Sequence, residues 1–384
     1  MAEIVKVAKG LENVVVDKTA IATTSNAGDL LYRGYKAIDL AEKKSFEDTA
    51  FLIINGKLPS EAESARFKET IHNNMKIDSS VREIMKINRE KDIMRNIRSM
   101  ISLYPYTEKE QQGLFLKMDS IIPQLSSDTF NAFKGKPFRD GEGNGYSETF
   151  FSMISNGKNK ENARSFQKLM ILYMEHEFNA STFALRVAAS TLADPISAVC
   201  SALATLKGPL HGGANSEVLE YLGSIKSKDD AKHFVDEKIL KGEKIMGFGH
   251  RVYKKRDPRA QFVKGELKKI APDYDLFQAA EAVEDYLWEK KNLPANVDLY
   301  AAILMKFLGI EESFYLPVFA ASRIYGWNAH YFEQVNNNKI IRPAAEYVGP
   351  ENLTLEPITS IFSASPFLLN AMKEYSLKGY PTII

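Results

Sequence analysis

Residues 245–259 (IMGFGHRVYKKRDPR) combine two glycines, one histidine and several lysines and arginines. Gly247 and Gly249 allow backbone N–H groups to approach a ligand closely, and His250 can exchange a proton near neutral pH. Arginines can bind carboxylate or phosphate through two hydrogen bonds. The segment therefore predicts a site for a polyanion. It is no dinucleotide-binding fingerprint, because the third glycine of that motif is absent.

Two other segments carry residues that suit acid–base chemistry. His211 lies in GPLHGGAN at 208–215, before the polar entry to a predicted helix. Near a helix N-terminus an imidazole is held neutral and can donate to a developing oxyanion. Asp298 ends PANVD at 294–298, where it could aim into a site, cap the next helix, or do both. The order of candidates along the chain is His211, His250, Asp298.

These three segments resemble the citrate synthase family, and so do four others: LYRGY at 31–35, EHE at 175–177, SRIYGW at 322–327 and IRP at 341–343. The resemblance implies an all-α fold with a large helical domain built from both ends of the chain, a smaller inserted helical domain, and a cleft between them. On this sequence the large domain is expected at 1–212 and 310–384, and the insertion at 213–309.

The resemblance also implies a role for each of the three candidates. Asp298 would be the base that removes a proton from the α-carbon of a thioester, His211 would stabilise the enol, and His250 would polarise the ketone of oxaloacetate. An ordinary aspartate has a pKa of about 3.9 and is a weak base, so we expect Asp298 to be desolvated.

The oxaloacetate site implied by the resemblance contains three histidines and three arginines. Arginine suits this task because its planar guanidinium group matches the geometry of a carboxylate and stays protonated. In the family, the arginine that matches Arg342 comes from the neighbouring subunit, which implies a homodimer. The expected residues are His176, His211, His250, Arg259, Arg323 and Arg342.

Coenzyme A is expected along the loop that precedes His250, as a co-substrate and not as a permanently bound cofactor. The main chain of the loop would contact the adenine, while Arg251 and either Lys254 or Lys255 would face the phosphates. The loop residues are Lys244, Ile245, Met246, Gly247, Phe248 and Gly249. We expect no metal, because the segment from Glu175 has alanine at position 180, where a zinc motif needs a second histidine.

The favoured activity is condensation of acetyl-CoA with oxaloacetate to citrate, as in the tricarboxylic acid cycle. The alternative is 2-methylcitrate synthesis from propionyl-CoA, since one methylene changes discrimination by only about 1–3 kcal/mol. A third possibility is a non-catalytic helical dimer that binds a partner through the apolar tail after Gly349.

The overall composition excludes several other classes of protein. Lys and Arg number 50 and Asp and Glu 49 in 384 residues, so no global field favours nucleic acid or an anionic membrane. The single Cys200 excludes an internal disulfide and fits a reducing compartment. The first residues lack a signal-peptide pattern, and we expect a cytoplasmic protein.

Helical periodicity dominates the sequence, and strand signals are confined to a hairpin predicted from residues 13–16 and 19–23. Ser45 and Ser60 are expected to cap two helices, the first ending at Gly56. The apolar region 182–206 predicts two core helices, because Asp194 and Pro195 interrupt it. Further helices are predicted at 80–88, 92–103, 108–125, 162–174, 229–240, 259–270 and 276–290. Residues 138–145, although rich in glycine, are expected to form a surface loop.

Overall fold

The computed structural model describes residues 6–25, 28–104, 111–155, 159–212, 214–249, 253 and 256–354, with only the backbone described at 214–216. The chain divides into two units, one formed by residues 1–7 with 342–384 and the other by residues 8–341. In the described part of the first unit, residues 342–354 contain no regular secondary structure, and Lys6 pairs with Glu346 at 2.5 Å. All elements below belong to the second unit.

The described residues contain one small antiparallel sheet of β1 (Ala22–Thr24), β2 (Leu30–Tyr32) and β3 (Tyr35–Lys36). Ala22 pairs with Tyr32, and Leu31 with Lys36. The predicted hairpin is therefore wrong in its first strand, since residues 13–16 are irregular and β1 pairs with a later segment. The physical reason is that Val15 is exposed, with no apolar surface to cover it.

Helices make up most of the described chain, which confirms the all-α class. The first group is α1 (Ala37–Lys43), α2 (Phe46–Asn55), α3 (Glu61–Asn74), α4 (Ser79–Asn88), α5 (Ile93–Ile101), α6 (Gln111–Lys134), α7 (Tyr146–Ile154), α8 (Lys160–Tyr173), α9 (Ala180–Ser190) and α10 (Pro195–Leu206). The second is α11 (Ala214–Ser224), α12 (Lys228–Lys241), α13 (Pro258–Ile270), α14 (Asp275–Lys291) and α15 (Val297–Phe307), followed by the 3₁₀ turn η2 (Glu312–Phe314) and α16 (Tyr315–Asn336).

The predicted caps are confirmed. Ser45 Oγ accepts a hydrogen bond from the N–H of Asp48, and Ser60 forms a complete capping box with Glu63. Gly56 ends α2 with a φ of 77°, in the left-handed region that glycine adopts without strain.

Helix α6 differs from its prediction because it continues past residue 125 to Lys134. The polar side chains of its second half are satisfied in part within the helix itself. Ser126 and Thr129 donate to the carbonyl oxygens four residues earlier, and Asp128 accepts from Gln124. Pairing inside the helix allows this polar sequence to be buried.

Helix α16 runs through the core, and Trp327 and Tyr325 are fully buried along it. It packs against α6, α9 and α2. Helices α9 and α10 pack side by side, as expected for 182–206, and Asp194 caps α10 by accepting from the N–H of Ser197. No helix in the described ranges is long and apolar enough to cross a membrane.

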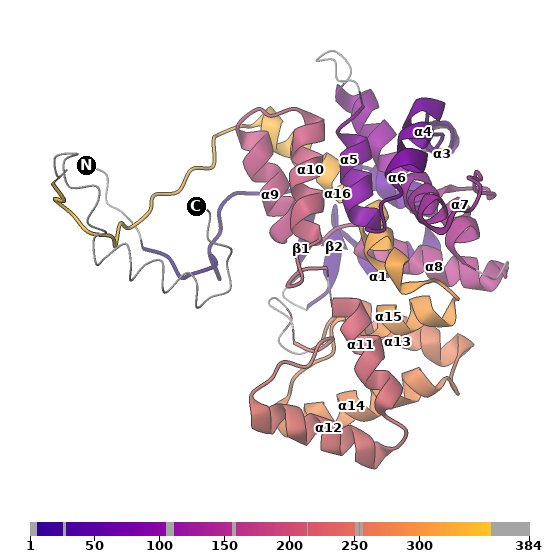
Figure 1. Ribbon diagram of the computed structural model, residues 1–384, viewed down its shortest axis with the longest axis vertical. Coiled ribbons are helices and arrows are strands. Elements are labelled where there is room, and N and C mark those ends of the chain that lie inside the picture. The colour runs from indigo at the N-terminus through magenta and orange to yellow at the C-terminus, as the bar shows by residue number, and fades with distance from the viewer. Residues whose placement is uncertain are drawn as a thin grey trace, which may run out of the picture. The chain divides into compact units, whose positions relative to one another are not determined.

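The helices from α11 to α15 gather together (Figure 1). Helix α12 packs on α14, while α11 and α13 both pack on α15. Helix α13 also contacts α1 and α8, so it joins this group to the preceding helices. The start of α15 lies near the start of α13, where the N–H of Val297 donates to Asp257, and near the end of α8, because Asp298 and Tyr173 interact electrostatically.

Candidate active site

Asp298 is the second residue of α15 and is partly buried. Asn296 caps the helix by accepting from the N–H of Asp298 at 3.1 Å, so the N-cap interpretation of Asp298 is wrong. Burial raises the pKa of Asp298 to about 6, although the nearby charges of Arg259 and Arg323 oppose the shift. The carboxylate is thus a stronger base than an ordinary aspartate.

The loop at 244–249 is tied directly to the loop that precedes Asp298. The N–H of Gly249 donates to Pro294 O at 2.8 Å, and the N–H of Asn296 donates to Gly247 O at 2.9 Å. The Asn296 amide also donates to Gly249 O at 3.1 Å. Gly247 has a φ of 87°, and an added Cβ would lie 3.1 Å from Leu299. These bonds fix the loop against the N-terminus of α15.

The other residues of this loop differ in exposure. Lys244 is exposed, whereas Ile245 is buried, and Met246 O accepts a hydrogen bond from the Tyr221 hydroxyl at 3.0 Å. Phe248 pairs with Ala295 in an isolated antiparallel bridge. The loop therefore presents one exposed cation, Lys244, while bonds of its backbone hold it in place.

His211 lies in the turn between α10 and α11 and is partly buried. Burial, and then the nearby charge of Arg323, lower its pKa to about 4, so the ring is neutral at pH 7. Its Nε2 lies 3.0 Å from Ser181 Oγ. The cause of the neutral ring is burial with a neighbouring cation, whereas the sequence argument relied on the start of a helix.

Arg259 is buried and forms a close pair with Asp257. Its Nε lies 3.1 Å from Oδ1 and its terminal NH2 nitrogen 2.8 Å from Oδ2. Asp257 also accepts from the N–H of Val297 at 3.2 Å, so one carboxylate orients Arg259 and joins α13 to α15. Sequence reasoning missed Asp257; its only signal was an aspartate before a proline at the start of a helix.

Arg323 projects from α16 and is 1% exposed. Its Nε donates to Tyr173 O at 2.8 Å, and its guanidinium lies 4.6 Å from the centre of the Phe319 ring. Its two terminal nitrogens make no hydrogen bond to the part of the chain that the structure describes. Burial lowers the pKa of Arg323, with the nearby charge of Glu175 opposing the shift. The terminal nitrogens can therefore bind an anionic ligand.

His176 is buried, and its two neighbours in sequence, Glu175 and Glu177, are both held by hydrogen bonds to other parts of the chain. Its ring lies 5.7 Å from the ring of Tyr253 in an edge-to-face arrangement. Glu177 has a φ of 53° and accepts the N–H of Thr24 at 2.6 Å. This sparsely populated backbone conformation is held by the contact with β1.

Glu175 belongs to a buried series of hydrogen-bonded polar side chains that sequence reasoning missed. His330 Nε2 lies 3.0 Å from Glu175 Oε1, and His330 Nδ1 lies 3.2 Å from a terminal nitrogen of Arg186. Because arginine only donates, Nδ1 must accept and Nε2 carries the proton. Arg186 also pairs with Asp17 at 2.9 Å and Glu333 at 2.8 Å. No linear motif signals these distant pairings.

The structure connects Asp298 to Arg259 and Arg323, and His211 to Arg323, through the effects of these charges on the pKa values of Asp298 and His211. Hydrogen bonds join the loop at 244–249 to the loop before Asp298. His250, Arg251 and Lys254 lie outside the described residues. Arg342 belongs to the other unit of the chain, where it is exposed. Among the described residues no group of three or more metal-ligating side chains occurs.

The helical fold and the site define a class of protein: a helical enzyme in which a desolvated aspartate and a neutral histidine both lie near the buried guanidinium of Arg323. Comparison with known proteins identifies the family. The family described as citrate synthase, C-terminal domain, matches residues 10–344. The 2-methylcitrate synthase of Shewanella oneidensis is 36% identical over 367 residues, covering 91% of this chain and 97% of that protein.

Citrate synthase 2 of Bacillus subtilis is 34% identical over 366 residues, with coverage of 91% and 98%. The citrate synthase structure from Thermotoga maritima superposes with a TM-score of 0.86 at 36% identity, covering 92% of this chain and 99% of that one. A Thermoplasma acidophilum citrate synthase, in ternary complex with carboxymethyl coenzyme A and oxaloacetate, gives 0.84 at 30% identity, with coverage of 92% and 99%.

The chain belongs to the citrate synthase family. It is an acyltransferase of the citrate synthase type, and the family uses coenzyme A thioesters as substrates. The alternative of a non-catalytic scaffold is thereby removed.

Proposed function

We propose that the chain condenses acetyl-CoA with oxaloacetate and then hydrolyses citryl-CoA to citrate and CoA. The observation that carries this proposal is the placement of Asp298, with its raised pKa, near the buried guanidiniums of Arg259 and Arg323. A desolvated base and a carboxylate-binding pair are what the two substrates require.

In the first step Asp298 removes a proton from the methyl carbon of the thioester, and the electron pair moves toward the carbonyl oxygen. Neutral His211 donates a hydrogen bond to that oxygen. The Ser181 hydroxyl has two acceptors within reach, Asn179 Oδ1 at 2.8 Å and His211 Nε2 at 3.0 Å. When it donates to His211, the ring proton lies on Nδ1, where it can meet the thioester.

In the second step the enol carbon attacks the ketone carbon of oxaloacetate and forms the new carbon–carbon bond. His250 polarises the ketone and supplies a proton to the resulting oxygen. Water then cleaves the thioester, releasing CoA and a carboxylate. Arg323 would bind one carboxylate of oxaloacetate through its terminal nitrogens, with Arg259 and His176 alongside.

The thioester would lie along residues 244–249, which support this placement by their bonds to the loop before Asp298. Arg251 and Lys254 are proposed to face its phosphates. We propose no permanently bound cofactor and no metal, because base, oxyanion donor and carboxylate clamps are all protein side chains.

The second candidate is 2-methylcitrate synthesis, favoured by the similarity to the Shewanella oneidensis enzyme of that name. The ratio of kcat/KM for acetyl-CoA to that for propionyl-CoA, at fixed oxaloacetate, decides between the two. We expect acetyl-CoA to be preferred. A strong preference for propionyl-CoA would assign the chain to 2-methylcitrate synthesis.

We also propose the domain boundaries 1–212, 213–309 and 310–384, a cytoplasmic homodimer, and a place in the tricarboxylic acid cycle. The boundaries are supported by the mutual packing of α11 to α15 and by Gly309, which has a φ of 73° where α15 ends. The homodimer rests on the family resemblance, in which the arginine that matches Arg342 comes from the neighbouring subunit.

A further inference from the structure

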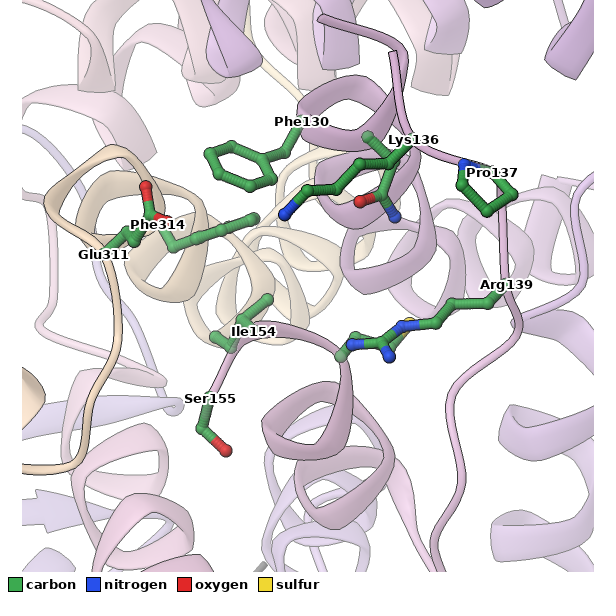
Figure 2. A pocket seen from close by; sticks show the side chains of 10 residues that line it. Phe130, Lys136, Pro137, Arg139, Ile154, Ser155, Glu311 and Phe314 are labelled. Atoms are coloured by element: carbon green, nitrogen blue, oxygen red, sulfur yellow. The ribbon is translucent and has the colours of Figure 1, made fainter. Parts of the chain in front are cut away.

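A cavity of about 220 Å³ lies away from the candidate active site, among α6, α7 and η2. Figure 2 shows Lys136 and Arg139 reaching into it from the segment after α6, with Ile154 on one side and Phe314 on another. None of its lining residues is a candidate for the acyl-transfer reaction. The volume is below the roughly 300–1,000 Å³ of drug-sized ligand sites, so the cavity suits a small molecule.

Hydrogen bonds hold the backbone that carries the two cations at this cavity, Lys136 and Arg139. Gly135 ends α6 with a φ of 66°, and the N–H of Lys136 donates to Asn131 O at 2.8 Å. Further along, Arg139 O accepts from the buried side-chain amide of Gln124 at 2.9 Å. The segment thus holds both side chains at the cavity by its main chain.

Within the described residues, neither Lys136 nor Arg139 forms an ion pair. Two nearby carboxylates, Asp128 and Asp140, are already used, since Arg82 binds the first at 2.8 Å and the second at 2.6 Å. Both cations are exposed, and Lys136 Nζ lies 5.9 Å from the centre of the Phe130 ring. Together they offer an anion two positive charges, and arginine can hold a carboxylate through two hydrogen bonds.

The other side chains that line the cavity indicate which shape of ligand it would accept. Phe130 and Phe314 touch with ring centroids 4.9 Å apart, and Ile154 is buried beside them. These side chains suit an apolar or aromatic body. Glu311 also lines the cavity, on the side of Phe314 in Figure 2, so the anionic group would lie away from it, on the side of Arg139.

The cavity adjoins the connection between α15, which carries Asp298, and α16, which carries Arg323. Ser155 and Ile310 form an antiparallel bridge at its edge, directly after Gly309. A ligand there would touch Glu311 and Phe314 and would order the turn η2. We infer that this cavity is a second ligand site, which takes a small carboxylate with an aromatic or branched apolar body and restrains the α15–α16 connection.

The test uses 4-fluorobenzoate as the probe, followed by fluorine NMR with saturating oxaloacetate present to occupy the active site. We expect saturable binding to the full chain. Arg139→Gln and Lys136→Gln should each weaken binding at least tenfold. Arg164→Gln removes an exposed arginine of α8 and should bind as the unmodified chain does. Uncharged 4-fluorobenzyl alcohol should not bind.

Amide hydrogen exchange gives the second measurement. The probe should slow exchange at residues 311–314 in the unmodified chain and leave it unchanged in Arg139→Gln. The inference is overturned if 4-fluorobenzoate does not bind, if the Arg139 and Lys136 variants bind like Arg164→Gln, or if binding leaves exchange at 311–314 unaffected. Binding of the probe only when oxaloacetate is omitted would also overturn it, by placing the probe in the active site.

Discussion

At the scale of single residues, burial sets the acid strength of the two described acid–base candidates in opposite directions. It raises the pKa of Asp298 to about 6 and lowers that of His211 to about 4. His211 is therefore neutral above about pH 4, and Asp298 is charged above about pH 6. Neutral donor and ionised base therefore coexist at neutral pH, as enolisation requires.

Asp298→Asn should lower kcat by about 10²–10⁴, because the amide keeps the shape and loses the basicity. The same variant should unfold at a higher temperature than the unmodified chain at pH 7.5, since a partly desolvated charge is removed. Steady-state kinetics and thermal unfolding measure the two effects. Near-normal turnover would remove Asp298 from the role of base.

The pH dependence of kcat/KM should show an acid limb near pH 6. Activity requires ionised Asp298, and its raised pKa means that the active form is lost as pH falls through about 6. His211 stays neutral until about pH 4 and cannot cause this limb. The residual activity of Asp298→Asn should lack the limb; its persistence in that variant would assign it to another group.

At this scale the prediction of the site came from compact motifs of glycine, histidine and aspartate. His211 and Asp298 were proposed from their local sequence and the family resemblance. Asp257 and Glu175 were missed because their partners, Val297 and His330, are distant in sequence. Such pairings depend on tertiary packing, which local patterns do not contain.

At the scale of elements, caps and periodicity predicted most helices, whereas the β element was misplaced. Strands of two or three residues, such as β1 and β3, give almost no periodic signal. The polar end of α6 was missed because its side chains bond within their own helix. Both failures come from interactions that composition does not reveal.

Gly247→Ala should raise the KM for the thioester and destabilise the fold by about 1 kcal/mol or more. Its φ of 87° disfavours a side chain, and the new Cβ would press on Leu299 and Val218 at 3.1–3.2 Å. Gly265→Ala is the matched control, because Gly265 lies within α13 with open space around it. Equal KM values in the two variants would show that the loop conformation does not serve the thioester.

His330→Phe should lower the free energy of unfolding by about 1–3 kcal/mol, because it removes the partner of the buried Glu175 Oε1 and one of the partners of Arg186. His72→Phe changes an exposed histidine of α3 and should have little effect. Urea unfolding compares the two variants. Equal stability of both would show that the buried chain through His330 does not stabilise the fold.

At the scale of the whole molecule, the shared-site proposal predicts complementation between inactive variants. Arg342→Leu and His250→Ala should each be nearly inactive as homodimers. A mixed dimer would contain one site with both changes and one with neither, so activity should return in part. If heterodimers form and activity does not return, Arg342 acts within its own chain.

The central claim is that this chain joins an acyl-CoA to oxaloacetate through its own side chains, without a bound metal. The most direct measurement supplies [2-¹³C]acetyl-CoA and oxaloacetate to chelator-treated protein, and follows free thiol and labelled product by mass spectrometry and carbon NMR. We expect one CoA and one labelled citrate per oxaloacetate consumed, and no thiol release without oxaloacetate. Release of CoA with acetate as the labelled product, or no turnover by folded protein, would contradict the claim.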